Sequence, residues 1–254
     1  MKKYFNKILL FFVVIMIQSN LFSQTSVSSY LKSSFKPAAI TIRKEDTLKK
    51  QFESKGLTWP AKYIYIRSFK YDAQLEVWAK NTLKEPYKLF KTYKVCMQSG
   101  TMGPKRLQGD FQVPEGYYSI NEFNPNSNYH LSMGLNYPNS SDRILSDSLR
   151  PGGDIYIHGS CVSVGCIPLT DDEIEELYLI ASSARSNGQE FIPVHVFPIR
   201  YNVKKSADYL AMATKNKEPL KKFEYQLKEV FEYFNEHKQL PVIMVNKKGE
   251  YVTN

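Results

Sequence analysis

The chain has 254 residues, 43% of them hydrophobic, and its 34 Lys and Arg outnumber 25 Asp and Glu to give a formal net charge of +9. This length fits one large domain or one domain with an appendage, and the apolar content is enough for a substantial core. The basic residues form no concentrated block and no nucleic-acid motif is present, so we expect no nucleic-acid partner. A moderately basic surface suits an anionic polymer of the cell envelope, but it is also an ordinary solvated surface.

The N-terminus has the organisation of a signal peptide, which we assign to residues 1–23. Three lysines within the first seven residues precede an unbroken run of ten apolar residues, Ile8–Ile17, and Ser23 is a small residue before a cleavage point at Gln24. Ten apolar residues are short for a bilayer span, and no cysteine at the cleavage point offers a lipid anchor. We expect export to the periplasm or cell envelope, with an uncleaved anchor as the alternative. Cleavage would leave a formal charge of +6.

A helix and then strands are expected next. Residues 24–59 consist of a Ser- and Lys-rich leader and an amphipathic helix over Arg43–Lys55, which Gly56 can cap. Period-two and β-rich patterns then predict three strands in a hairpin-like order, at Tyr63–Arg67, Gln74–Ala79 and Tyr87–Met97.

Two loop-rich segments follow the strands. Residues 99–118 contain turn signals at Gly103-Pro104 and around Gly116. Residues 119–149 predict a strand through His130 and then a polar loop.

The segment with the clearest chemistry is Asp154–Cys166. Polar Asp154, Tyr156 and His158 alternate with two isoleucines, which predicts a short strand over Asp154–His158. Glycines at 159 and 165 permit a tight loop that brings Cys166 near His158. A thiol beside an imidazole is the minimum set for a nucleophilic cysteine. The eight-residue separation does not match papain-like or caspase-like enzymes.

Three cysteines are present, and an oxidising compartment favours their pairing. The odd number leaves at least one thiol free, and we expect Cys166 to be that one. The spacing is also compatible with a reversible disulfide between Cys161 and Cys166.

The remainder of the chain alternates between helix and strand. Thr170 and Glu173 form a capping-box pattern for a helix to about Ser186. We therefore interpret the run of acids in its first turns as residues that stabilise the start of the helix through its dipole, and we predict no metal site. Phe191–Ile199 predicts a strand with His195 on its solvent side or in a wall. A helical extension, residues 201–254, combines two further helices and a closing strand, at Tyr209–Ala213, 217–237 and Pro241–Val245.

The pair His158-Gly159, followed by Ser163-Val164-Gly165-Cys166, resembles the HG…S-x-G-C motif of the L,D-transpeptidase catalytic domain (YkuD) family. The compact spacing and the following Ile167–Asp171 resemble its YafK-like branch, although Pro168 stands where most members have Arg. Residues 99–118 resemble the family's G…GPK…GD…TPEG-Y element, with Val113 for the usual Thr. Residues 129–143 resemble the branch's H-L-S…Y-P-N…D-R element.

The resemblance implies a mostly-β α+β fold, with a sandwich or barrel catalytic domain at residues 60–200. It implies Cys166 as nucleophile and His158 as the base, oriented by a backbone carbonyl near Gly159. Backbone N–H groups of Gly165 and Cys166 would form the oxyanion hole, and Ser163 would brace the loop.

For the substrate, the resemblance implies peptidoglycan stem peptides, without a metal or organic cofactor. His130 and Tyr137 would lie at the cleft, and Arg143 could replace the missing Arg as a carboxylate anchor. The alternative is a satisfied core histidine and a surface arginine.

Three alternatives stay open. The acyl acceptor can be an amine of another stem, an amine of an envelope protein, or water, in which case the enzyme is a hydrolase that can also cut protein–peptidoglycan links. A non-catalytic wall-binding module is a second class, and a thiol-redox protein using Cys161 and Cys166 is a third. We expect a monomer.

Overall fold

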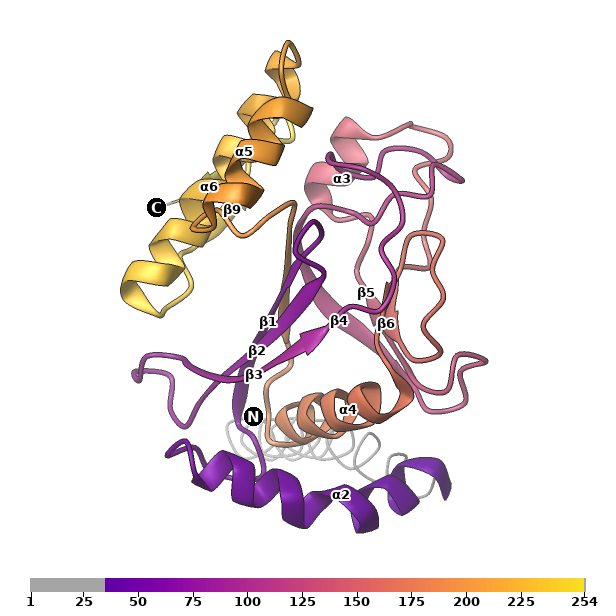
Figure 1. Cartoon of the computed structure of the whole chain (residues 1–254), viewed down its shortest axis with the longest axis vertical. Helices are drawn as coiled ribbons and strands as arrows, with labels where there is room; N and C mark the ends of the chain where they lie inside the picture. The colour runs from indigo at the N-terminus through magenta and orange to yellow at the C-terminus, as the bar shows by residue number, and fades with distance from the viewer. Residues whose placement is uncertain (1–34, 254) are drawn as a thin grey trace, which may run out of the picture.

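The computed structural model describes residues 35–253, which form one curled sheet with helices on both faces (Figure 1). Eight strands pair in the order β3-β2-β1-β8-β4-β5-β6-β7, and a separate hairpin pairs β9 with β10. Their bounds are β1 Tyr63–Phe69, β2 Gln74–Lys80, β3 Lys88–Lys94, β4 Gly116–Asn124, β5 Ser132–Leu135, β6 Tyr156–His158, β7 Ile167–Pro168, β8 Pro193–Phe197, β9 Ile243–Val245 and β10 Tyr251–Thr253. The described helices are α2 Phe35–Glu53, α3 Ser140–Leu145, α4 Asp171–Ser186, α5 Lys204–Ala213 and α6 Glu218–His237. The expected mostly-β α+β class is confirmed.

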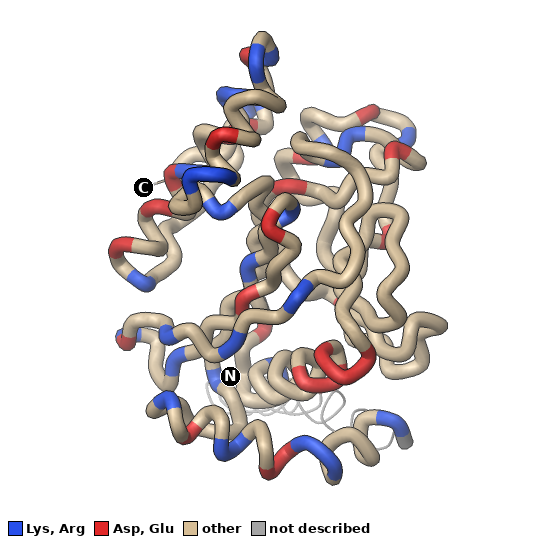
Figure 2. The backbone as a smooth tube through the Cα atoms, in the orientation of Figure 1, with Lys and Arg blue, Asp and Glu red and all other residues tan. Residues whose placement is uncertain are grey.

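One face of the sheet packs against α4, and α2 lies against α4 on its far side (Figure 1). Side chains with period-two spacing on β1 and β8 supply this face, among them Ile64, Ile66 and Val194, all fully buried. Figure 2 shows acids gathered at the first turns of α4, where they complement the helix dipole. Arg43 and Lys44 of α2 pair with Glu175 and Asp172 of that cluster.

The opposite face of the same strands packs against α6 and is aromatic. Phe69 and Phe197 join Phe231 of α6 in one cluster, and Tyr65 joins Phe234 of α6 in another. Because alternate residues of a buried strand point to opposite faces, one sheet serves two cores.

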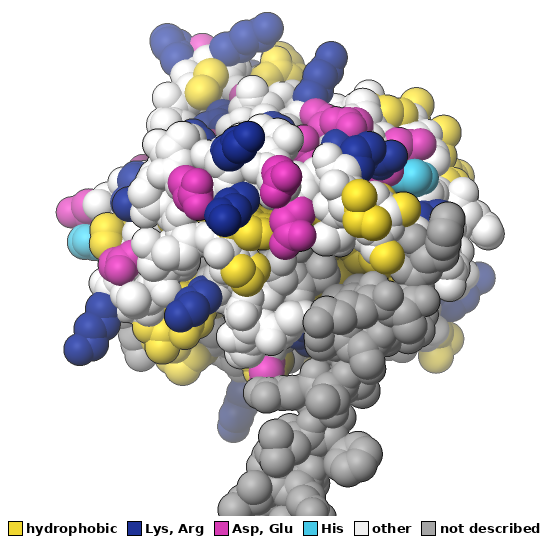
Figure 3. Space-filling model, turned by 90° about the horizontal axis from the view of Figure 1, so that it is seen from below, with side chains coloured by type: hydrophobic (Ala, Val, Ile, Leu, Met, Phe, Trp, Pro, Cys, Tyr) yellow, Lys and Arg dark blue, Asp and Glu magenta, His cyan; other side chains and the backbone are white. Residues whose placement is uncertain are grey.

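Figure 3 views the molecule from below and shows cationic and anionic side chains interspersed over the described part of that face. No helix within residues 35–253 is long and apolar enough to cross a membrane. The predicted signal peptide, residues 1–23, lies outside the described residues.

The structure extends or corrects several predicted elements. The first helix begins at Phe35, before the predicted Arg43, because Ile40 also packs into the core. The predicted strand at Phe191–Ile199 is confirmed as β8, but His195 is 4% exposed and not on the solvent side. The β9–β10 hairpin pairs the expected closing strand with a second strand that the sequence pattern did not indicate.

Candidate active site

The β6 and β7 strands hold Tyr156, His158 and Cys166 on one face of the sheet edge. The two strands are parallel, with Ile157 opposite Ile167 and His158 opposite Pro168. Cys166 immediately precedes β7, just as Tyr156 immediately precedes Ile157 in β6. Since side chains two residues apart share a face, the three polar groups point away from the core while Ile157 and Ile167 are buried in it. The predicted alternation holds over Tyr156–His158, whereas Asp154, with φ +55, lies before the strand that was predicted to include it.

A cavity of about 360 Å³ opens at this face. His158 and Cys166 both line it, together with residues from three other segments. Its lining is Asn124, Asn126, Ser127, Asn128, Tyr129, Ser132, Asp154, Tyr156, His158, Val164 and Cys166. The thiol and the imidazole that the sequence singled out therefore share one cavity.

The His158 imidazole is fixed by its own loop. Its Nδ1 lies 2.6 Å from the Gly159 carbonyl oxygen, so Nδ1 carries the hydrogen and donates it. The ring of Tyr129 packs 4.8 Å from the imidazole, centroid to centroid. Burial lowers the pKa of His158, although its bond to Gly159 acts in the opposite direction. The imidazole is therefore neutral near pH 7, with Nε2 able to accept a proton.

Cys166 is the free cysteine of the described chain. Burial raises the pKa of its thiol, and the negative charge of Asp154 acts in the same direction, while a hydrogen bond from the Tyr156 backbone opposes them. Its Sγ lies 3.5 Å from the Asp154 carbonyl oxygen, to which the thiol donates. Because the thiol and the imidazole are both neutral, the thiol must lose its proton to a base during the reaction. A thiolate formed beforehand would need no such base.

The loop before Cys166 is held by Ser163. Its Oγ accepts from the backbone N–H groups of Gly165, at 3.1 Å, and Cys166, at 3.0 Å, and donates to the Cys166 carbonyl at 2.8 Å. Gly165 has φ +137, and an added Cβ would lie 3.1 Å from the Gln112 carbonyl oxygen, so glycine is required there. The two N–H groups predicted to form the oxyanion hole are therefore engaged by Ser163 in this structure.

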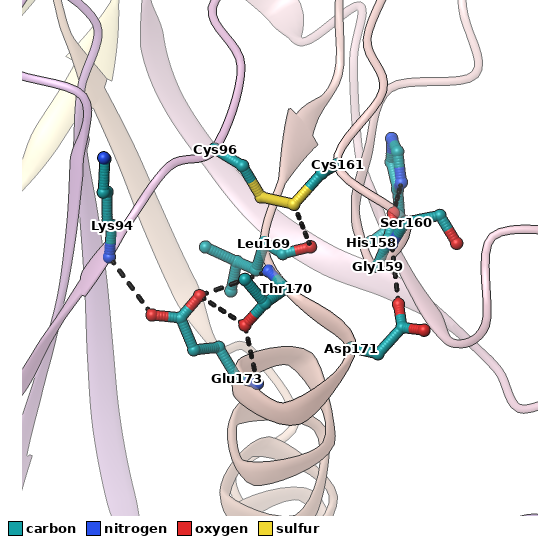
Figure 4. Close-up of a disulfide and its surroundings, with 10 residues drawn as sticks. All are labelled: Lys94, Cys96, His158, Gly159, Ser160, Cys161, Leu169, Thr170, Asp171 and Glu173. Atoms are coloured by element: carbon teal, nitrogen blue, oxygen red, sulfur yellow. Dashed lines mark hydrogen bonds between the residues drawn. A yellow bond between two sulfur atoms is a disulfide. The ribbon is translucent and has the colours of Figure 1, made fainter.

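A disulfide joins Cys96, just after β3, to Cys161 (Figure 4). This pairing corrects the sequence-based alternative of a Cys161–Cys166 disulfide, because Cys96 is brought close by the fold although 65 residues away in the chain. It also removes the support for a redox pair at 161 and 166. Ser160, next to Cys161, donates its backbone N–H to Asp171 Oδ1 at 2.8 Å.

Gly159 leaves no room for a side chain. An added Cβ would lie 2.6 Å from Asp171 Oδ1 and 3.0 Å from the Tyr129 carbonyl oxygen. Its N–H donates to the Tyr129 carbonyl at 3.0 Å. The glycine after His158 thus allows the loop to pass between the start of α4 and the wall of the cavity.

The predicted substrate-contacting residues lie outside this cavity. His130 Nε2 is 2.8 Å from Glu175 Oε1 of α4, and the Tyr137 hydroxyl donates to the Pro151 carbonyl at 2.9 Å. Arg143 of α3 donates from Nε to the Pro138 carbonyl at 3.1 Å and lines a different cavity. The described contacts of His130 and Tyr137 hold the fold together, and Arg143 faces the β9–β10 hairpin.

Two groups of cavity residues were missed by the sequence reasoning. The end of β4 and the turn after it supply Asn124 and Asn126–Tyr129, and Asp154 supplies the acid next to the thiol. An Asn-rich turn just before the His130 motif was the available signal for the first group. Asp154 was noted only as a position in the strand pattern.

A larger cavity, about 560 Å³, lies between α2 and α4 but contains neither a cysteine nor a histidine. Within residues 35–253, no group of three or more His, Cys, Asp or Glu side chains is arranged to hold a metal ion.

The sequence model of the L,D-transpeptidase catalytic domain (YkuD) matches residues 69–196. The chain belongs to this family. The L,D-transpeptidase family acts on peptidoglycan stem peptides.

Two curated relatives carry the name "Putative L,D-transpeptidase YafK", from Escherichia coli strains K12 and O157:H7. Each is 34% identical over 193 residues, which cover 75% of this chain and 74% of the relative. The family and its YafK-like branch, suggested by the cysteine motif, are confirmed.

Among solved structures, the helical cell shape determining protein Pgp2 of Campylobacter jejuni is 19% identical, with a TM-score of 0.43 over 79% of this chain and 80% of that chain. Bd1075 of Bdellovibrio bacteriovorus is 20% identical, with a TM-score of 0.40 over 75% of this chain and 79% of that chain.

Proposed function

We propose that this L,D-transpeptidase family member is an exported cysteine acyltransferase that acts on peptidoglycan stem peptides, with Cys166 as its nucleophile. One observation carries the proposal. A free, partly exposed thiol shares a cavity with a buried imidazole whose Nδ1 is bound to a backbone carbonyl. This fixes Nε2 as the nitrogen that can take the thiol proton. The family supplies the class of substrate.

The first half-reaction makes a thioester. The Sγ proton of Cys166 passes to His158 Nε2 as Sγ attacks the carbonyl carbon at the L-centre of the stem's diamino acid. When the C–N bond breaks, the imidazolium returns that proton to the leaving amine of the terminal residue. The neutral resting state of both groups suits this order, because the proton is transferred only as the sulfur attacks.

The second half-reaction consumes the thioester. An incoming amine or water loses a proton to His158 Nε2 as it attacks the thioester carbon, and the proton then returns to the departing sulfur. An amine forms a cross-link or attaches an envelope protein, whereas water releases the shortened stem.

A hydrolase, which cuts L,D-bonds or protein–peptidoglycan links, is the second candidate. The observation that favours it is the position after the cysteine motif, where Pro168 in β7 replaces the Arg common in the family. The residues lining the cavity also include neither Lys nor Arg, so a carboxylate of a second stem has no cationic partner there. The intact thiol and imidazole argue against a purely wall-binding module.

Intact mass of the purified mature protein, with and without a carbapenem, tests the nucleophile. Carbapenems acylate the cysteine of this family, so we expect one adduct on the wild type and none on Cys166→Ala. No adduct on reduced, folded wild-type protein would contradict an activated and accessible thiol at this position.

Stem tetrapeptides then test the reaction. We expect a thioester mass on the wild type and release of the terminal residue. Products formed with and without an added amine acceptor separate transpeptidation from hydrolysis. A peptide that binds without losing its terminal residue would point to the wall-binding alternative.

A further inference from the structure

Asp154 is the one acidic residue that lines the cavity around Cys166. It immediately precedes Ile155 and β6, and its carbonyl oxygen accepts from the Cys166 thiol at 3.5 Å. Its side chain is exposed, and none of the hydrogen bonds or ion pairs among residues 35–253 engages its carboxylate. A carboxylate that lines a cavity and has no partner among these residues is available to a ligand.

The backbone at Asp154 turns just before the strand. Its φ is +55, in the left-handed region, which Asp and Asn adopt more readily than most residues other than glycine. The strand that follows fixes this residue beside the thiol.

The rest of the lining is uncharged at neutral pH. It comprises asparagines, serines, tyrosines and a valine, besides His158 and Cys166. Lys105 does not line the cavity; it is 5% exposed and donates to Asp110 Oδ1 at 2.6 Å and to the Leu107 carbonyl at 2.9 Å. Asp154 is therefore the charged residue of the lining, and the lining carries net negative charge.

We propose that Asp154 forms a subsite for a primary ammonium group of the substrate and so determines specificity for amine-bearing stem peptides. This inference rests on the proposed function, because it assigns a ligand to the same cavity. Surrounding asparagine and serine side chains, such as Asn126 and Ser132, can accept the remaining N–H bonds of an ammonium.

Two amines have this chemistry. One is the second amine of the diamino acid within the acyl donor, which stays protonated through the reaction. The other is the incoming acceptor amine, which binds as ammonium and must lose a proton before it attacks the thioester. The Asp154 carboxylate would attract either one towards the sulfur.

The test uses two stem tetrapeptides that differ only in acetylation of the diamino acid's free amine. Binding is measured by calorimetry on Cys166→Ala protein, with and without Asp154→Asn. Asn has nearly the same shape and tolerates positive φ, so the change removes charge and little else. We expect about fivefold tighter binding of the free-amine peptide, and we expect Asp154→Asn to abolish that preference, as for one partly exposed ion pair.

A kinetic arm distinguishes the acceptor. On protein with Cys166 intact, the ratio of aminolysis to hydrolysis is measured with a primary amine acceptor. A fall of about fivefold in this ratio in Asp154→Asn, with the binding preference unchanged, would assign the subsite to the acceptor. Ratios cancel any general effect of Asp154 on the reactivity of the thiol, since that effect acts equally on both products.

Glu122→Gln is the matched control. Glu122 lies on β4, near the Tyr156 hydroxyl, but does not line the cavity. We expect Glu122→Gln to leave unchanged both the binding preference for the free-amine peptide and the ratio of aminolysis to hydrolysis. If Glu122→Gln changes these two ratios as much as Asp154→Asn does, or if Asp154→Asn changes neither of them, the subsite is refuted. If no peptide forms a thioester on the wild type, the proposed function fails, while the binding arm still decides the subsite.

Discussion

Two buried histidines show what distinguishes the cavity around Cys166 from the face that packs on α6. His158 is 3% exposed and His195 is 4% exposed, and burial lowers the pKa of each. His195, with its pKa lowered to about 3, is bound at Nδ1 to the Tyr65 hydroxyl and packs against the ring of Tyr117. His158 has Nδ1 bound to a carbonyl and lines a cavity with a thiol.

The comparison shows that burial and a lowered pKa do not identify a catalytic base. A catalytic base is identified instead by access to a cavity and by a reactive neighbour. The α6 face even contains more buried ionisable groups, including Lys70, Glu115 and Glu224. Lys70 pairs with Glu115, and the Tyr201 hydroxyl donates to Glu224, whose pKa is raised well above its ordinary value by burial and by the neighbouring Glu115. Burial of an ionisable group therefore does not by itself mark a reactive site.

The largest expected effect separates the two histidines. His158→Gln should lower the rate of Cys166 acylation about a thousandfold, because the proton acceptor is lost. His195→Gln should stay within a factor of about three, because it is distant from the cavity. The rates are followed by intact mass after mixing with a carbapenem. Equal losses of acylation rate in the two folded variants would contradict the proposed difference between the two histidines.

The next effect tests the charges on the α6 side. Lys70 Nζ donates to Glu115 Oε1 at 2.8 Å and to the Thr101, Gly103 and Val113 carbonyls, and both partners of the ion pair are buried. Lys70→Met should lower the free energy of unfolding by about 4 kcal/mol, because Glu115 would be left buried without its partner.

Lys204→Met removes an exposed ion pair with Asp208 and serves as the control. It should cost less than about 0.5 kcal/mol. Both are measured by denaturant unfolding. If Lys70→Met lowers the free energy of unfolding no more than Lys204→Met does, the buried ion pair does not stabilise this face.

On the cavity side, stability depends on the disulfide. Cys96→Ser with Cys161→Ser should lower the free energy of unfolding by about 3 kcal/mol, because the cross-link restricts the unfolded chain over a separation of 65 residues. Cys166→Ser should change it by less than about 1 kcal/mol. Thiol titration of the unfolded mature protein should find one thiol before reduction and three after. Three thiols before reduction would contradict the pairing.

The smallest effect concerns the resting protonation state. Alkylation of Cys166 by iodoacetamide should rise about tenfold per pH unit from pH 6 to pH 8, because only the thiolate reacts and burial raises the pKa of the thiol. Below its pKa a thiol loses reactivity in proportion to the thiolate fraction. A plateau that begins near pH 5 would instead indicate a thiolate–imidazolium pair, and the proposed order of proton transfer would be wrong.

Local patterns in the sequence predicted strand β6, which carries His158, and the helix α4. The alternation at 154–158 indicated which side chains leave the core, and Thr170 with Glu173 forms the predicted capping box. These features depend on neighbours within a few residues, so period and side-chain chemistry determine them. The motif around Cys166 likewise identified the family, since its residues are close in the chain.

Tertiary structure alone decided the partners of these residues. Cys161 is much nearer to Cys166 than to Cys96 in the sequence, yet it pairs with Cys96, 65 residues away, because β3 ends beside the loop. The Asn-rich turn after β4 became a wall of the cavity through the pairing of β4, β5 and β6. His130 and Arg143 were directed to Glu175 and to the β9–β10 hairpin. Such contacts join segments far apart in the chain, and local periodicity carries no information about which distant segments meet.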